Sequence, residues 1–333
     1  MATLLGKLSV VGASKPPGPI PLRALLRRSR AERTLAVVCR NLGIDCPDES
    51  SILGRQILAA HQAREIARQV EVLPLKGLDL AHRLYPSPSL RDMGDVDLLV
   101  RRRAVPDADA ALRRLGYVPD RDALRAAEGD GGFLNAVVYD REDVLPVHLH
   151  WRLSNASLPH FMYRIDEEEV WRQARGGTLA PHHRVVALCE HALKHSFDTL
   201  ILLTDIELAC RGADWNAVAE TARAWGLGRA VYYALVLLRD LLGVEAAGLR
   251  SLRVRALGLE GRAFLAAMRG RRWDGLSALG LLSLARGAAA KARFVREALA
   301  PPAEARPALR SRSVAERLRS AARMIWQGIT LRR

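Results

Sequence analysis

Apolar residues recur at helical spacing in the first part of the chain. From residue 51 to residue 70 they follow a period near 3.6, so we predict a helix there, capped by Ser50 or Ser51. Residues 1–20 end in a Pro/Gly cluster, which predicts a loose N-terminus. Residues 21–70 are therefore interpreted as a set of N-terminal helices.

Shorter apolar runs separated by turn residues occupy residues 71–178. We predict strands at EVLPLKG and DVDLLV, then an antiparallel hairpin of FLNAVVYD and VLPVHLHW around a turn at 140–143. Helices are predicted at 78–85, ended by Pro86, and at 105–117, closed near Gly116. This block predicts a small mixed β-sheet flanked by helices.

Helical patterns dominate the remainder of the chain. Residues 179–298 predict a helical domain, so the fold class is α+β, a mixed-sheet core extended by C-terminal helices. Prolines follow at 301, 302 and 307, and residues 299–333 end in a basic amphipathic helix or tail that contains Trp326. Docking on the helical domain is favoured for that helix over binding to an anionic membrane or polymer.

The charge balance is unusual. The chain has 51 basic and 36 acidic residues among 333, a net charge of +15, and nearly all of the base is arginine. The excess of arginine is explained either by a high-GC genome or by a surface that binds polyanions. Nucleic-acid binding is not favoured, because aromatic residues are not interleaved with the basic ones. The four cysteines lack a C-x-x-C spacing, and no apolar run reaches 18 residues, so we expect a cytoplasmic protein with reduced thiols and no membrane span.

The chemistry concentrates between residues 74 and 100. Asp95 and Asp97 lie two residues apart in a predicted strand, so their side chains share a face, and paired carboxylates favour a divalent cation. Two acids at this spacing also occur as a cap-and-turn pair facing water, so the motif alone is weak. Its surroundings strengthen it, because Lys76, Gly77 and Arg91 are suited to contact phosphate oxygens.

These residues belong to a longer ordered set, which spans roughly residues 50–245: Leu75-Lys76-Gly77, Leu84-Tyr85-Pro86, Arg91, Asp95-Val96-Asp97-Leu98-Leu99-Val100, His150-Trp151-Arg152-Leu153, His191, Lys194-His195 and Leu203-Thr204-Asp205. The set resembles the DNA polymerase beta-like nucleotidyltransferase superfamily, in particular a poorly characterised bacterial branch. The resemblance implies that acids on two strands hold two Mg²⁺ ions, or Mn²⁺, which align the α-phosphate of an NTP with an acceptor hydroxyl. Asp95 and Asp97 would be metal ligands, and Lys76, Gly77 and Arg91 would bind the nucleotide.

One departure from the family pattern concerns the third acid. Its position, two residues before the His-Trp pair, holds His148, and imidazole is a poor ligand for Mg²⁺. The metal site or the general base is then weakened, or another acid such as Asp140 or Glu142 completes it. Alternatively, His148 and His150 are ordinary polar side chains on a half-exposed strand.

A second histidine pair lies further along the chain. His191 and His195 are four residues apart on a predicted helix, a spacing that suits a metal. We favour a structural role, in which they pack against the sheet block or line its cleft and Asp205 anchors them by hydrogen bonds.

The function predicted from the sequence is nucleotidyl transfer from an NTP to an unidentified acceptor, with His148 placed beside Asp95 and Asp97 as a catalytic residue. The acceptor is a small molecule, peptide, sugar or protein side chain. The alternative is a catalytically reduced nucleotide-binding or regulatory module that kept the fold and lost a metal ligand.

Overall fold

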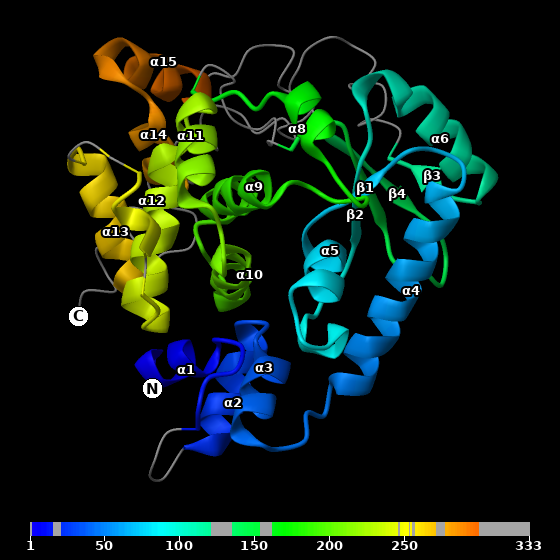
Figure 1. The fold of residues 1–333 in the computed structure, drawn as a ribbon, viewed down its shortest axis with the longest axis horizontal. Helices are drawn as coiled ribbons and strands as arrows, with labels where there is room; N and C mark the ends of the chain where they lie inside the picture. The colour runs from blue at the N-terminus through cyan, green and yellow to red at the C-terminus, as the bar shows by residue number, and fades with distance from the viewer. Residues whose placement is uncertain are drawn as a thin grey trace.

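The computed structural model describes residues 2–15, 21–120, 135–153, 162–245, 247–252, 254, 257–270 and 277–299. These residues form a mixed α+β structure, in which a five-stranded sheet lies beside a larger group of helices (Figure 1). This confirms the predicted fold class. The basic segment at residues 300–333, with Trp326, lies outside the described residues.

The helices and strands have the following bounds. The α-helices are α1 (Ala2–Leu8), α2 (Leu22–Ala31), α3 (Leu35–Leu42), α4 (Glu49–Ala67), α5 (Lys76–Arg83), α6 (Val105–Arg114), α8 (Glu167–Gln173), α9 (Pro181–Lys194), α10 (Leu200–Cys210), α11 (Trp215–Ala224), α12 (Gly228–Leu237), α13 (Leu259–Gly270), α14 (Ser277–Leu284) and α15 (Gly287–Leu299). Short 3₁₀ turns are η1 (Pro88–Leu90), η2 (Arg102–Ala104) and η4 (Ala247–Leu249), and η3 (Leu238–Leu242) is π-helical. The strands are β1 (Leu73–Pro74), β2 (Val96–Leu99), β3 (Val118–Pro119), β4 (Ala136–Asp140) and β5 (Val147–His150).

The sheet has the strand order β1-β2-β5-β4-β3. Strands β2 and β5 run parallel at its centre, and the other neighbouring pairs are antiparallel. The predicted hairpin is therefore present as β4 and β5, whereas the two-residue strand β3 and its pairing with β4 were not predicted. The parallel pair matters for the site, because the Asp-x-Asp motif and the His148–His150 run lie on adjacent strands.

One face of the sheet is covered by α4 and α6. The alternate residues Val96, Leu98 and Leu149 are buried there, in a cluster that includes Ala59 of α4 and Leu112 of α6. In Figure 1 these two helices lie on the outer side of the sheet, away from the helical group. The polar residues between the buried ones consequently face the other side, toward α5 and α9.

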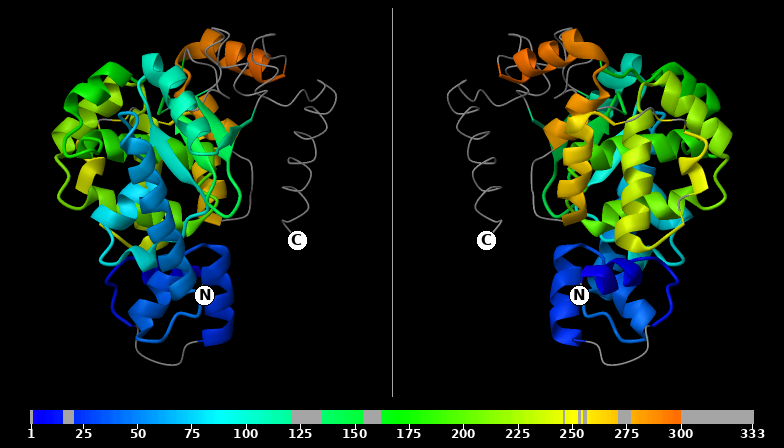
Figure 2. Two further views of the ribbon diagram at one scale, coloured as in Figure 1. Left: turned by 90° about the vertical axis from the view of Figure 1, so that its right-hand side faces the viewer. Right: turned by 90° about the vertical axis from the view of Figure 1, so that its left-hand side faces the viewer.

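The helical part and the N-terminal helices share a second core. It includes Leu5 of α1, Val38 of α3, Leu99 of β2 and Leu193 of α9. Figure 2 shows α1–α3 as one group at the lower end of the molecule. The N-terminal segment that the sequence predicted to be loose thus begins with a packed helix, because Leu5 and the other buried apolar residues of α1 bury their side chains against neighbouring helices.

Two further sequence expectations can be compared with the structure. The predicted strand 71–77 is much shorter, since β1 ends at Pro74 and α5 already begins at Lys76. The four cysteines are free thiols, as predicted. None of the helices in the described ranges has both the length and the apolar character that a membrane span needs.

We predict that Gly6 fixes the contact between α1 and η3. A Cβ on Gly6 would overlap the carbonyl oxygen of Leu241, so Gly6→Ala should lower the free energy of unfolding by about 1–3 kcal/mol through overpacking. Gly54→Ala is the matched control, because nothing lies near that position on α4, and the better helix former should stabilise the protein by about 0.5–1 kcal/mol. Urea unfolding measures both. Equal stability changes of the same sign would contradict the close packing at Gly6.

Candidate metal- and nucleotide-binding site

Two acidic and two histidine side chains share the polar face of the central strand pair. Asp97 on β2 lies opposite His148 on β5, and directly opposed residues point to the same face of a sheet. The Nδ1 atom of His148 lies 3.4 Å from Oδ2 of Asp95 and 3.8 Å from Oδ1 of Asp97. The two carboxylates therefore face one imidazole, as the alternation in the sequence predicted.

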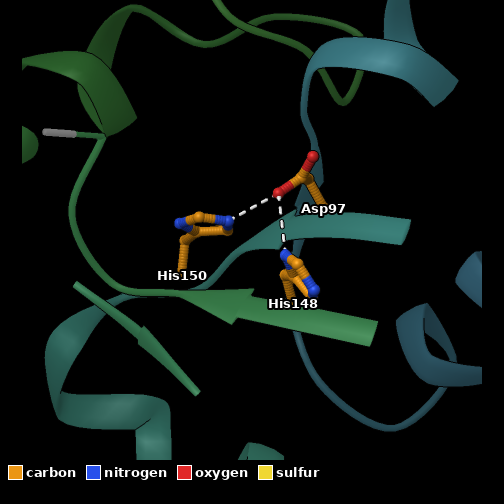
Figure 3. A group of neighbouring side chains, drawn as sticks. All are labelled: Asp97, His148 and His150. Atoms are coloured by element: carbon orange, nitrogen blue, oxygen red, sulfur yellow. Dashed lines mark hydrogen bonds and ion pairs between the residues drawn. The ribbon is translucent and has the colours of Figure 1, made fainter. Parts of the chain in front are cut away.

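Asp97 is the centre of this group. Its side chain is only 6% exposed, and Oδ1 lies 2.7 Å from Nζ of Lys76 and 2.6 Å from Nε2 of His150 (Figure 3 shows the contacts with the two histidines). Burial alone would raise the pKa of Asp97, but the charge of Lys76 and the hydrogen bond from His150 outweigh it and hold the pKa well below its usual range. Asp97 is thus an ionised carboxylate at neutral pH.

His150 is neutral at the same pH. Burial and the nearby Lys76 lower its pKa to about 4, although Asp97 acts in the opposite direction. Its Nδ1 lies 3.4 Å from Nδ2 of Asn135, an arrangement in which Asn135 donates to Nδ1 and Nε2–H donates to Asp97. The hydrogen bond from His150 to Asp97 is the part of the site that sequence reasoning did not predict; the alternation His-Leu-His beside the Asp-x-Asp strand is the signal for it.

Lys76 reaches Asp97 from a tight turn between β1 and α5. Its φ of +46° lies in the left-handed region that residues with a side chain rarely adopt. The backbone N–H of Leu75 donates to the carbonyl of Asp97 at 2.9 Å, so the turn is tied to β2 directly. The strained backbone therefore brings the ammonium group to the buried carboxylate.

Gly77 follows Lys76 in the first turn of α5. A Cβ there would lie 3.1 Å from Cβ of Met93, which is tighter than ordinary van der Waals contact. We expected a glycine here to let the backbone approach a phosphate. The structure adds a packing requirement, because the residue must be small to fit against Met93.

The comparisons with known proteins give one family. The family described as "Uncharacterised nucleotidyltransferase" matches residues 49–243, more than half of the 333 residues. The chain belongs to this nucleotidyltransferase family. No curated protein and no solved structure matches it. The match covers α4 through the end of the π-helical η3 and includes every residue of the group around Asp97.

The end of α9 adds cationic and imidazole groups to this face of the nucleotidyltransferase. Burial, followed by Lys76, lowers the pKa of His191 well below its usual range, while Asp97 acts in the opposite direction. The rings of His191 and His195 lie 4.6 Å apart. Burial and Lys76 also lower the pKa of Lys194, while Glu190 and Asp97 act in the opposite direction. These influences place the end of α9 beside the face that carries Asp97, where the histidines were predicted to pack.

The predicted anchoring of these histidines by Asp205 is wrong. Asp205 on α10 accepts hydrogen bonds from Arg91, at 2.7 Å from Nη2 and 2.9 Å from Nε, and from the Tyr85 hydroxyl at 2.7 Å. Arg91 and Asp205 are 6% and 2% exposed. Burial would lower the pKa of Arg91, but Asp205 more than compensates and raises it, so the guanidinium is charged.

The same ion pair gives Arg91 a structural contact that was not predicted from the sequence, while its predicted phosphate-binding role stays a prediction. The Nε and Nη2 atoms of its guanidinium donate to the buried carboxylate of Asp205, and Nη1 donates to the carbonyl of Asp92. Arg91 holds the segment before Asp95 against α10, and Lys76 is the cation that contacts Asp97 directly.

The substitute acids suggested by the sequence do not join the group. Within the described ranges, the three side chains that lie close enough together to hold a metal ion are those of Asp97, His148 and His150. Asp140 ends β4 in register with Val118, and Glu142 is exposed in the turn that follows. Among the described residues His148, rather than Asp140 or Glu142, lies beside Asp95 and Asp97.

We predict that Arg91 acts on stability. Arg91→Ala would leave Asp205 buried without its cation, so the free energy of unfolding should fall by about 3–5 kcal/mol. Arg55→Ala is the matched control, since its ion pair with Asp92 is about one-third exposed and should contribute less than about 1 kcal/mol. Chemical denaturation gives both values. If Arg91→Ala were as stable as the control but bound NTP more weakly, the phosphate role predicted from the sequence would be right.

Proposed function

We propose that this nucleotidyltransferase moves a nucleoside monophosphate from an NTP to an acceptor hydroxyl, at the face formed by β2 and β5. The observation that supports the proposal is the arrangement of Asp95 and Asp97 opposite His148, with the Lys76 ammonium against Asp97. Family membership supports the class of reaction. The carboxylates, the imidazole and the fixed cation are the groups that phosphoryl chemistry uses.

The residues fit a divalent metal, though not in the way the family resemblance implied. Asp97, with His148 opposite it, would hold the ion, and the ion would neutralise charge on the phosphate oxygens when bound. Two acids offer the oxygen ligands that Mg²⁺ prefers, but the third position offers nitrogen, and Lys76 already lies against Asp97. The donor set consequently departs from a site for two Mg²⁺ ions, while it still accommodates a divalent cation.

The chain's own groups have distinct tasks in the proposed transfer. The acceptor oxygen attacks the α-phosphorus, the bond to the bridging oxygen breaks, and pyrophosphate leaves. Asp95, which is more exposed than Asp97 and lies beside His148, accepts the proton of the acceptor hydroxyl. Lys76 carries a positive charge beside the phosphates, and the first turn of α5, which includes Gly77, lies next to it. The acceptor is a small molecule, peptide, sugar or protein side chain.

One observation favours the second candidate, a nucleotide-binding or regulatory module without catalysis. Asp97 already has a cation and a neutral donor within hydrogen-bond distance, so its buried charge is compensated by the protein alone. A site that is stable without a metal could have retained nucleotide binding after losing turnover. The binding module therefore has the same nucleotide site, and differs in releasing no pyrophosphate.

We predict that transfer depends on both acids. Purified protein is incubated with each labelled NTP, Mg²⁺ or Mn²⁺ and pools of candidate acceptors, and mass spectrometry detects a product heavier by one nucleoside monophosphate. Asp95→Asn and Asp97→Asn should each reduce the rate at least about 100-fold, the scale for losing a charged group that acts on the transition state. Asp107→Asn, an exposed acid in the first turn of α6, should leave the rate unchanged.

The outcomes separate the two functions. Nucleotide binding with no pyrophosphate release under any of these conditions would support the binding module. Turnover that is insensitive to both Asp→Asn changes would place the reaction elsewhere in the chain and contradict both.

A further inference from the structure

The group around Asp97 has the composition of a transition-metal site. One carboxylate oxygen of Asp97 and one ring nitrogen each of His148 and His150 lie within 4.8 Å of one another (Figure 3). They come from two paired strands, so the sheet itself holds them in register. A metal ion needs ligand atoms at such mutual distances, and the strands supply them without rearrangement of the backbone.

The ligand types select among ions. Mg²⁺ requires near-octahedral oxygen coordination, whereas imidazole suits Zn²⁺, Co²⁺ and other first-row transition ions, and Mn²⁺ tolerates it better than Mg²⁺ does. Asp97 and His150 are buried, with side chains 6% and 9% exposed, while the side chain of His148 is 31% exposed. The site is therefore closed on its inner side and open beside His148, where water or a phosphate oxygen could complete the coordination.

His150 can become a ligand without leaving its place. In the metal-free arrangement Nε2–H donates to Asp97, so a metal at Nε2 requires the proton to move to Nδ1. Asn135 lies 3.4 Å from Nδ1, and rotation of its amide by half a turn presents the oxygen as an acceptor for that proton. Such an outer hydrogen bond is typical of metal-binding histidines.

Lys76 limits the number of ions. Its ammonium lies 2.7 Å from Oδ1 of Asp97, the oxygen that also faces both histidines. An ion held by Asp97 and the two histidines already shares this carboxylate with the ammonium, so a second divalent ion on Asp97 would bring a third positive charge to the same group, and like charges at such short range repel strongly. The φ of Lys76, +46°, lies in a region that residues with a side chain rarely adopt, and the ammonium extends to Asp97 from this backbone.

We propose that Asp97, His148 and His150 bind a single divalent transition-metal ion, and that the Lys76 ammonium takes the place of a second ion on the same carboxylate. The assignment deepens the proposed nucleotidyl transfer and rests on it for the task of the ion. It replaces the two Mg²⁺ ions implied by the family resemblance with one metal and one lysine.

Metal titration of the chelator-treated full chain, without nucleotide, tests the proposal. Calorimetry should give one Co²⁺ or Zn²⁺ per chain, at least about tenfold tighter than Mg²⁺, and bound Co²⁺ should show visible absorption bands altered by nitrogen ligation. His148→Ala should weaken Co²⁺ binding at least about tenfold. His61→Ala is the matched control, because that exposed histidine on α4 lies beside Glu65, away from the site, and should change nothing.

Two further variants test the ligand role of His148 and the charge role of Lys76 separately. His148→Asp should strengthen Mg²⁺ binding and weaken Co²⁺ binding, since it exchanges nitrogen for oxygen. Lys76→Gln should raise the stoichiometry from one ion to two. Because His148 and Lys76 are not fully buried, circular dichroism should show both variants folded.

Several results would overturn the proposal. The proposal fails if Mg²⁺ binds as tightly as Co²⁺, if His148→Ala leaves Co²⁺ binding unchanged, or if the wild type binds two ions. If Lys76→Gln still binds a single ion, the role proposed for the lysine is wrong. These failures differ from failure of the proposed function. A site that binds one Co²⁺ in a protein that transfers no nucleotide would leave the metal site standing and reject the transfer.

Discussion

The structure around the site depends on a buried negative charge. Asp97 is almost fully buried, and an isolated carboxylate there would be very unfavourable. Lys76 and His150 compensate it from α5 and β5, which ties three elements to one oxygen atom. Because Lys76 supplies the positive charge, His150 remains neutral and contributes a hydrogen bond.

A second buried ion pair fixes the position of the elements around the site. Arg91 precedes the Asp-x-Asp strand, and Asp205 lies on α10 within the helical part. Their contact, with the Tyr85 hydroxyl as a further donor, fixes the sheet block against the helices. Because α9 packs beside α10, this docking also brings His191 and Lys194 toward the face that carries Asp97. The position of the helical part is therefore coupled to the electrostatics of the site.

Local sequence patterns predicted which side chains share a strand face, but they did not predict the contacts between residues far apart in the sequence. Strand alternation placed Asp95 and Asp97 on one face and put His148 with His150, because side-chain direction depends only on neighbouring residues. The partners of the buried charges were missed, since Asp205 is 114 residues from Arg91 and His150 is 53 from Asp97. Buried acids and cations pair so that their charges are compensated in the core, and sequence spacing does not reveal these pairs.

The most direct test of the central claim is a crystal structure of the full chain with a non-hydrolysable NTP and Mn²⁺, with anomalous diffraction to locate the ion. The account predicts one anomalous peak at coordination distance from Asp97 and His148, with the triphosphate on the same face and close to Lys76. A triphosphate bound away from β2 and β5, or a peak without contact to Asp97, would contradict it.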